Sequence, residues 1–229
     1  MSANRVAPSR PPGPGKVFYP MFVDLEGRRC LVVGGGPVAT EKVEKLLEHG
    51  AVVRLVTPAA TDALAALVAS GAVAEHRTRA YRPEDLDGCF LVIAATNLDA
   101  INRMVWQDAE ARGLLCNVVD VPPLCNFIVP SIVRRGELAL AISTGGASPV
   151  VAKHIRRELE GAYGPEWEAL VDLLRDVRDD LKVRYPDMPS RRDAVERLMR
   201  TDVVRRLAEG DEEGARDLAC RVLDIGVRA

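Results

Sequence analysis

The fold is decided by residues 28–39, which read RRCLVVGGGPVA. A short apolar strand ends there in three glycines, and a helix follows, because apolar side chains recur at the spacing of one helix face. Pro37 suits the first turn of that helix, where its missing N–H leaves no bond unmade. The pattern G-x-G-x-x-G/A indicates a dinucleotide-binding turn when it follows a strand and precedes a helix, as it does here. The residues of the helix face are Ala39, Val43, Leu46 and Leu47.

Each small residue of the glycine turn has a physical role. Gly34 permits the tight turn, Gly36 lets a diphosphate approach the backbone, and Ala39 keeps the helix close to the sheet. The helix N-terminus offers free N–H groups and partial positive charge to phosphates. These residues are candidate cofactor ligands, and the alternative is a glycine-rich turn that binds nothing.

Strands and helices alternate on both sides of this stretch, over residues 28–118. The run at 90–95 is uninterrupted and apolar, as in a strand that is buried on both faces. Short loops between alternating elements indicate a parallel, doubly wound α/β sheet with right-handed crossovers. Beyond the first strand, we expect strands at 51–56, 72–76, 90–95 and 114–119, and helices at 59–70 and 98–113.

The pattern changes after Asp120. Two strands are expected at 127–134 and 138–143, and then a helix with Ser148 as its N-cap and Pro149 in its first turn. From Pro165 onward only helices are expected. They are a stripe over 167–181 that ends at Tyr185-Pro186, a helix that begins at Ser190 with Asp193 in a capping-box position, and a helix over 212–225.

Composition excludes several classes of protein. The 229 residues carry 31 Lys and Arg against 33 Asp and Glu, without the basic excess of a general nucleic-acid binder. No apolar run approaches the roughly 20 residues that span a bilayer. Aromatic residues make up 4%, too few for a stacking platform. We therefore expect no nucleic acid and no membrane among the partners.

Cysteine usage and the N-terminus indicate the cytoplasm. The five cysteines are odd in number and form no C-x-x-C pair, so buried, reduced thiols are expected. The first 17 residues lack the apolar core of a signal peptide and suggest a flexible tail. The three histidines do not combine with the cysteines at zinc-ligand spacing, so no resident metal is expected.

The end of the second strand lacks the acid that commonly binds the ribose. A dinucleotide fold places Asp or Glu about 20 residues after the glycine turn, but here the chain reads Thr57-Pro58. The hydroxyl of Thr57 and the nearby backbone are the available partners. Arg54 is expected to be an exposed strand residue and not a 2′-phosphate clamp, so the choice between NAD and NADP stays open. Thr96 follows the fourth strand and should border the same crevice.

Two further signals lie beyond the glycine turn. Asp120 follows the fifth strand, where a carboxylate could act as a general base beside a nicotinamide or could cap the next loop. The stretch 143–149 sets two hydroxyls and two glycines before a helix. It is either an anion site or a turn with a capping serine.

Taken together, these stretches resemble the precorrin-2 dehydrogenase and sirohydrochlorin ferrochelatase family, the N-terminal module of siroheme synthase. The resemblance covers about residues 18–185. The stretches that carry it are 19–22, 32–39 with Lys42, 94–97, 116–120 leading into 125–131, and 142–149. One departure is Thr40-Glu41, where the family usually has an arginine before the lysine. Glu41 should point outward, so we expect little effect.

The resemblance implies NAD-dependent oxidation of precorrin-2 to sirohydrochlorin, with iron insertion in some members. It implies that Asp120 is the essential carboxylate and that the protein is a homodimer. The other cofactor contacts implied are Pro37, Val38, Pro58 and Ala59, and the proposed substrate-binding residues are Asn117, Ser143, Thr144, Gly145 and Gly146. Arg134, Arg135 and Lys153 are further candidates for the substrate's carboxylate arms.

The resemblance also divides the chain. We expect a flexible tail at 1–17, a Rossmann-like NAD-binding domain at 18–125, a small α+β dimerisation region at 126–160 and a helical segment at 161–229. This length leaves no room for a fused methyltransferase, so precorrin-2 is expected to come from another protein.

Competing functions make different demands on the sequence. A short-chain dehydrogenase needs a lysine four residues after a tyrosine, and none of the four tyrosines has one. A non-catalytic nucleotide-sensing module would explain the glycine turn but not Asp120 together with residues 143–149. A chelatase with a vestigial dinucleotide site would not need the intact glycine turn.

Overall fold

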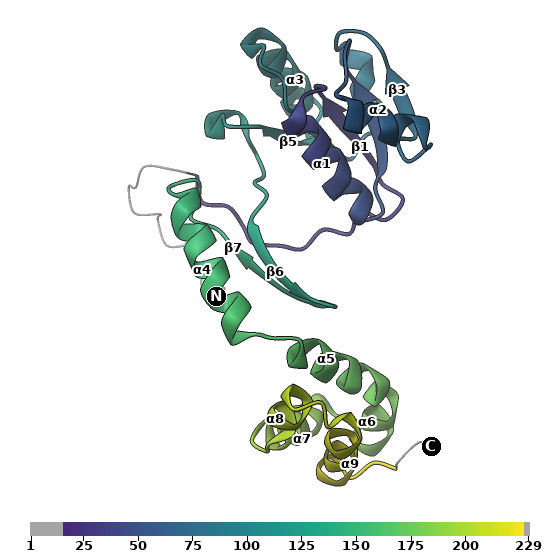
Figure 1. Ribbon diagram of the computed structural model, residues 1–229, viewed down its shortest axis with the longest axis vertical. Coiled ribbons are helices and arrows are strands. Elements are labelled where there is room, and N and C mark those ends of the chain that lie inside the picture. The colour runs from purple at the N-terminus through teal and green to yellow at the C-terminus, as the bar shows by residue number, and fades with distance from the viewer. Residues whose placement is uncertain (1–15, 227–229) are drawn as a thin grey trace, which may run out of the picture. The chain divides into compact units, whose positions relative to one another are not determined.

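The computed structural model describes residues 16–226. The chain divides between Val129 and Pro130 into two compact units (Figure 1). Each unit has a core of its own, with two apolar clusters in the first and one in the second. Most of the tail predicted at 1–17 lies outside the described residues, and Lys16 and Val17 have no regular secondary structure.

A five-stranded parallel sheet forms the centre of the first unit. Its strands lie in the order β3-β2-β1-β4-β5, so the chain changes its direction of travel across the sheet between β3 and β4. This is the order of a doubly wound, Rossmann-like sheet, and it confirms the predicted fold class. The strands are β1 (Arg29–Val33), β2 (Val52–Val56), β3 (Glu75–Arg77), β4 (Leu91–Ala94) and β5 (Leu115–Val118).

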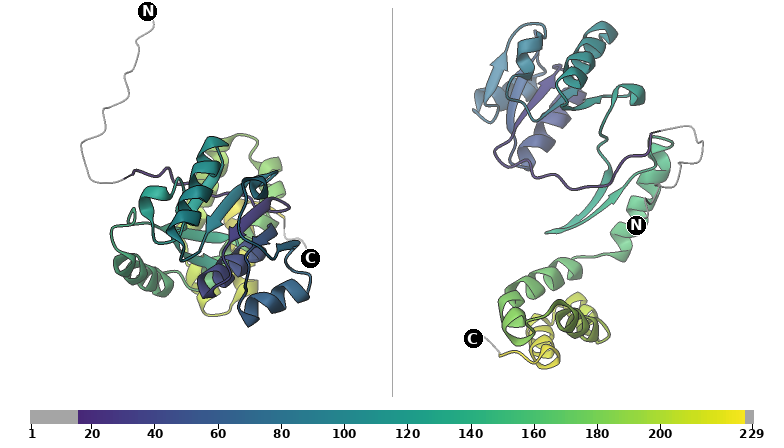
Figure 2. Two further views of the ribbon diagram at one scale, coloured as in Figure 1. Left: turned by 90° about the horizontal axis from the view of Figure 1, so that it is seen from above. Right: turned by 180° about the vertical axis from the view of Figure 1, so that it is seen from behind.

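Helices cover both faces of this sheet, as Figures 1 and 2 show from three sides. Val43 of α1 and Leu64 of α2 pack in the same cluster as Val32 of β1. Val105 of α3 packs in the other cluster with Leu31, the neighbour of Val32 on the opposite face. Burial on both faces explains why the strands are continuous apolar runs. The helices are α1 (Pro37–Glu48), α2 (Asp62–Ala69) and α3 (Asp99–Ala111).

Two elements of the first unit differ from the pattern. The strand predicted at 72–76 is wrong in position, because β3 is a three-residue edge strand, Glu75–Arg77, that pairs with β2 alone. The helix predicted at 59–70 begins later, at Asp62. Thr61 is the N-cap of this helix, because the Thr61 hydroxyl oxygen accepts the N–H of Leu64 at 3.3 Å.

The second unit begins with an antiparallel pair, β6 (Ser131–Arg135) and β7 (Leu138–Ile142), against which α4 (Pro149–Ala162) packs. The strand predicted at 127–134 starts later, after Pro130, which has no N–H to give to a ladder. The predicted N-cap is confirmed, because the Ser148 hydroxyl accepts the N–H of Val151 at 3.3 Å.

The C-terminal part of the second unit is helical, as predicted. Its core includes Leu173, Leu181, Leu198 and Leu223, which are all buried. The helices are α5 (Glu166–Asp176), α6 (Arg178–Arg184), α7 (Met188–Met199), α8 (Val203–Ala208) and α9 (Glu212–Leu223).

Two predictions for this helical part are wrong, and one helix was not predicted. The single stripe over 167–181 belongs to two helices, which break at Val177. The helix predicted to start at Ser190 starts at Met188, because the Asp187 carboxylate accepts the N–H of Ser190 at 2.8 Å and is the cap. The pattern gave no sign of α8, whose Val203 is buried in the core but belongs to a helix of its own.

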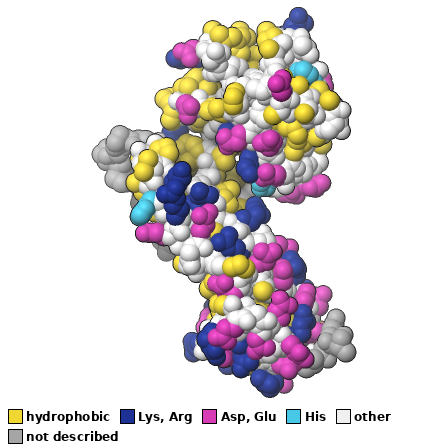
Figure 3. Space-filling model, in the orientation of Figure 1, with side chains coloured by type: hydrophobic (Ala, Val, Ile, Leu, Met, Phe, Trp, Pro, Cys, Tyr) yellow, Lys and Arg dark blue, Asp and Glu magenta, His cyan; other side chains and the backbone are white. Residues whose placement is uncertain are grey.

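Charged side chains of both signs alternate over the helical part (Figure 3). Many pair at the spacing of one helix turn, such as Arg205 with Glu209 at 2.9 Å and Arg206 with Asp202 at 3.3 Å. They form a solvated surface. Within residues 16–226, none of the helices combines the length and the apolar composition that a bilayer span requires.

All five cysteines are buried and unpaired, as the sequence predicts. Burial raises the pKa of both Cys30 and Cys116 to about 12. Such thiols stay protonated near neutral pH and act as small apolar residues.

Candidate functional site

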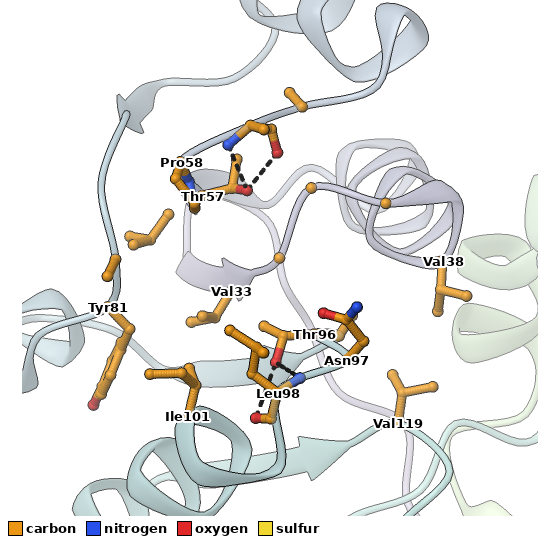
Figure 4. A pocket seen from close by; sticks show the side chains of 18 of the residues that line it. Val33, Val38, Thr57, Pro58, Tyr81, Thr96, Asn97, Leu98, Ile101 and Val119 are labelled. Carbon is orange, nitrogen blue, oxygen red and sulfur yellow. Dashed lines mark hydrogen bonds between the residues drawn. The ribbon is translucent and has the colours of Figure 1, made fainter.

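A pocket opens at the carboxyl ends of the strands in the first unit (Figure 4). Its volume of about 780 Å³ lies in the range of small-molecule sites, roughly 300–1,000 Å³. The loops that follow all five strands build its wall. Of the predicted site residues, those in the wall are Gly34, Gly36, Pro37, Val38, Thr57, Pro58, Ala59, Thr96 and Asp120.

The glycine turn lies against two other loops of the pocket. Gly34 has a φ of 132°, and a Cβ on it would lie 2.3 Å from the carbonyl oxygen of Ala95. A Cβ on Gly35 would lie 1.8 Å from the carbonyl oxygen of Ala59, whereas one on Gly36 would meet nothing within 4 Å. Gly34 and Gly35 are therefore required by packing, and Gly36 leaves open space on the pocket side.

The N-terminus of α1 faces the pocket without a side-chain cap. Gly36 is the N-cap residue and makes no such bond, and Pro37 occupies the first turn. Uncapped N–H groups and the helix dipole favour an anionic group there. Ala39 lies behind the wall, fully buried in the apolar cluster between α1 and the sheet.

Two threonines in the wall use their hydroxyls to shape loops. Thr57 donates to the carbonyl oxygen of Ala59 at 2.6 Å, so its hydroxyl hydrogen is taken. Thr96 donates to the side-chain oxygen of Asn102 at 2.8 Å, and Asn102 donates back to the Thr96 carbonyl at 2.9 Å. The sequence gave no sign of Asn102, because a buried amide inside a helix leaves no pattern.

Asp120 lies on the pocket wall in a left-handed conformation, with a φ of 59°. Aspartate adopts this region more readily than most residues. The neighbouring backbone fixes the turn, because Val119 donates to the carbonyl of Ala94 at 3.0 Å and Val121 donates to that of Val118 at 3.1 Å. The backbone of Asp120 is therefore fixed at the carboxyl end of β5, and the residue is exposed on the pocket that the glycine turn borders.

Asn117 does not line this pocket. Its amide donates to the carbonyl of Phe127 at 3.1 Å and lies 3.6 Å from the sulfur of Cys125. These contacts join β5 to the segment that returns after the Asp120 loop.

A cluster of charges that the sequence did not reveal adjoins the pocket. Arg79, in the wall, binds both oxygens of Asp85, with N–O distances of 2.7 and 2.9 Å. Burial opposes the ionisation of Asp85. Hydrogen bonds from Arg79, from the Arg82 N–H and from Arg77 outweigh it and lower the pKa of that carboxyl to about 2.

Arg54 was expected to be an exposed strand residue, but it is only 6% exposed. It pairs with Glu75 at 2.5 Å and donates to the carbonyl oxygens of Asp85 and Asp87 at 2.7 and 3.1 Å. These partners lie up to 33 residues away in the sequence, which is why a strand pattern could not reveal them. Arg54 does not line the pocket.

The turn at 143–146 belongs to the second unit, between β7 and α4. Ser143 accepts the N–H of Gly145 at 3.0 Å, and Thr144 accepts the N–H of Ser148 at 3.1 Å. Gly145 and Gly146 both have positive φ, at 63° and 87°. Both hydroxyls thus stabilise the turn itself. Among the described residues, no group of three or more His, Cys, Asp or Glu side chains could hold a metal ion.

Three family models match successive parts of the chain. Residues 21–131 match "Putative NAD(P)-binding", residues 135–162 match "Sirohaem biosynthesis protein central", and residues 166–223 match "Sirohaem synthase dimerisation region". The residues that match the dimerisation region, 166–223, follow the segment 126–160, to which the resemblance assigned dimerisation.

Curated relatives agree with these matches. The chain is 41% identical over 210 residues to a siroheme synthase of Thioalkalivibrio sulfidiphilus, covering 92% of this chain and 43% of that protein. It is 44% identical over 181 residues to siroheme synthase 1 of Pectobacterium atrosepticum, covering 79% and 38%. The chain thus spans less than half the length of these relatives.

A solved structure shares the fold. It is "SirC, precorrin-2 dehydrogenase", which matches with a TM-score of 0.73 and 26% identity over 90% of this chain and 100% of that one. The matched models, the relatives and the doubly wound sheet with its glycine turn agree with the resemblance in the sequence. The chain therefore belongs to the siroheme synthase family.

Proposed function

We propose that this chain catalyses the NAD-dependent oxidation of precorrin-2 to sirohydrochlorin. The observation that carries the proposal is that Asp120 and the glycine turn line one pocket. The chain's similarity to siroheme synthases and to a precorrin-2 dehydrogenase supplies the substrate.

The residues present fit a dinucleotide. Gly36 leaves room for a diphosphate beside the uncapped N-terminus of α1, and the loop after β2 offers its backbone at Pro58 and Ala59. Val38 is 42% exposed at the pocket edge and offers an apolar surface. In Figure 4, Pro58 and Val119 lie on opposite sides of the pocket, which matches a ligand that spans it from β2 to β5.

When bound, the nicotinamide ring supplies a hydride acceptor. Oxidation of precorrin-2 removes a hydride and a proton, so the protein must supply a base for the proton. The Asp120 carboxylate is the acid–base group on the pocket wall at the β5 side, and we assign the proton to one of its oxygens. The fixed left-handed turn gives the backbone of Asp120 a defined position.

Substrate arms require separate groups. We propose that the turn at 143–146, at the N-terminus of α4, binds a carboxylate of the tetrapyrrole, because such ends favour anions. Since its hydroxyls are used within the turn, the backbone is the part that would bind. Asn117 is also kept as a proposed substrate contact, although its amide hydrogen already binds Phe127.

We propose a homodimer in the cytoplasm. The match of residues 166–223 to a dimerisation region supports the dimer. Exposed apolar side chains on α4, Val150 at 77% and Val151 at 47%, support a contribution from the predicted segment 126–160. The five unpaired cysteines support a reducing compartment.

The test supplies precorrin-2 and NAD and follows the absorbance of sirohydrochlorin. Asp120→Asn keeps the left-handed backbone, because asparagine also adopts it, and removes the base. We expect turnover to fall by about 10²- to 10⁴-fold. Asp87→Asn is the matched control, since Asp87 is exposed at the amino end of β4 and should leave turnover unchanged.

Each result has one meaning. No turnover by the unmodified protein, with NAD bound, would favour a nucleotide-sensing module. Equal turnover by Asp120→Asn would remove Asp120 from its role. Ferrous iron added after oxidation tests metal insertion as a separate activity.

A further inference from the structure

The side of the pocket formed by β2 and β3 carries a cation and no carboxylate. Among the described residues that line the pocket, only Arg79 and Asp120 have a formal charge. Arg79 follows β3 and Asp120 follows β5, and these strands are the two edges of the sheet. The adenosine half of a dinucleotide binds on the side of the first strands in this fold, so Arg79 is the charged group near it.

The Arg79 guanidinium is held in one orientation. It donates to both oxygens of Asp85 and to the carbonyl of Ala80, at 2.7 to 2.9 Å. Asp85 has no exposed side-chain surface and also accepts the N–H of Arg82 at 2.7 Å. These bonds use three of the five N–H groups of a guanidinium. Two remain for a ligand.

The ionic network behind Arg79 has a surplus of positive charge. Arg54 pairs with Glu75 at 2.5 Å, Glu75 pairs with Arg77 at 2.6 Å, and Arg77 pairs with Asp85. With Arg79, three arginines face two carboxylates within this network, and the exposed Glu84 acts on Arg79 from outside it. Arg79 is the member of the network in the pocket wall, so the surplus is available to a bound anion there.

We propose that Arg79 binds the adenosine ribose side of the dinucleotide, and that this pocket accepts a 2′-phosphorylated dinucleotide, NADP, as well as NAD. The inference rests on the dinucleotide site of the proposed function. Folds that select NAD place a carboxylate on the ribose hydroxyls, and it would repel a 2′-phosphate. Here the loop after β2 has none, and an oriented arginine matches the geometry of a phosphate.

Direct binding tests the proposal without the reaction. The full chain is titrated calorimetrically with NAD and with NADP in the absence of tetrapyrrole. We expect both to bind, with dissociation constants within about tenfold of each other. Arg79→Gln should weaken NADP binding by about tenfold to hundredfold, which is roughly the contribution of a charge-assisted hydrogen bond. It should weaken NAD binding much less.

Arg77→Gln is the matched control. It removes one positive charge and one bond to Asp85 from the same network, but Arg77 is not in the pocket wall. We expect its affinity for NAD to stay within about twofold of that of the unmodified protein. Its affinity for NADP should fall less than that of Arg79→Gln, because the surplus charge is lost but the N–H groups of Arg79 remain in the pocket wall. An equal loss in both variants would show that the network acts only through folding and would overturn the proposal.

The remaining outcomes separate the two proposals. If the protein binds NAD but not NADP, the inference about Arg79 is wrong and the proposed function stands. If it binds neither, the proposed function fails as well.

Discussion

Gly35 lies against the carbonyl group of Ala59, so closely that a Cβ on Gly35 would be 1.8 Å from that oxygen. The same Cβ would be 2.5 Å from the hydroxyl oxygen of Thr57. The N–H of Thr61 donates to the carbonyl of Gly35 at 2.9 Å and joins the same two loops. The middle glycine, a free position in the motif, is therefore the one that fixes the glycine turn to the loop after β2.

Gly35 and Gly36 should respond differently to alanine. We expect Gly35→Ala to lower the free energy of unfolding by about 1–3 kcal/mol, the cost of overpacking, and to lose NAD binding. Gly36→Ala should keep its stability, because its φ of −82° suits alanine and no atom lies within 4 Å. Its methyl group would occupy the pocket and weaken NAD binding. Thermal unfolding and NAD titration measure both effects, and normal binding by Gly36→Ala would contradict the assigned site.

The Asp85 carboxylate should make the first unit sensitive to acid. Its pKa of about 2 in the folded state lies below the value of about 3.9 for an unfolded chain. Its stabilisation is therefore complete above about pH 4 and is lost as the pH falls toward 2, an effect of about 2 kcal/mol. We expect Asp85→Asn to be less stable at pH 7 and to lose less stability between pH 4 and pH 2.

Urea unfolding at several pH values measures this loss. In a Trp167→Phe background, the remaining Trp106 reports on the first unit, where it packs against the core. A mutant that loses as much stability as the parent between pH 4 and pH 2 would contradict the assignment to Asp85.

The sheet could be predicted from the sequence because each strand, turn and helix is marked by residues that lie close together in the chain. An apolar strand, a turn and a helix repeat within about 25 residues, and the glycine turn marks where the first helix begins. The charge cluster was not predictable in this way. Arg54, in β2, and the Asp85 carbonyl, in the segment between β3 and β4, meet across 31 residues, and only the folded chain brings them together. For the same reason, Arg79 was missed as a pocket residue.

The helical part shows a second limit of periodicity. Val177 is buried, and it continues the apolar stripe of α5 into α6, so the pattern does not reveal the break between them. Near the start of α7, both Asp187 and Ser190 have side chains that can cap a helix. The sequence alone predicted Ser190 as the cap. The structure shows the Asp187 carboxylate on the Ser190 N–H.

The cap of α7 can be tested by a pair of alanine substitutions. We expect Asp187→Ala to lower the free energy of unfolding of the second unit by about 1 kcal/mol, the usual value of an N-cap. Ser190→Ala keeps the N–H that Asp187 binds and should cost less. Trp167 packs against the core of this unit, so its fluorescence in a Trp106→Phe background follows the transition. A larger loss of stability in Ser190→Ala than in Asp187→Ala would mean that Ser190 is the cap.

Asn126 should govern the position of Asp120 from the far side of the loop. Its side-chain oxygen accepts the N–H of Cys116 at 2.7 Å, and its amide donates to the carbonyl of Leu114 and to Glu110, both at 2.8 Å. These bonds hold the returning end of the loop beside β5.

We expect Asn126→Ala to lower kcat by about tenfold to hundredfold, because a shift of the order of 1 Å in a catalytic group can cost that much. The dissociation constant for NAD should not change, since the glycine turn follows β1 and makes none of these bonds. Steady-state kinetics and NAD titration on the same sample separate the two effects. A parallel loss of NAD affinity would mean that the substitution disturbs the whole unit, and Asn126 would then have no specific part in placing the carboxylate.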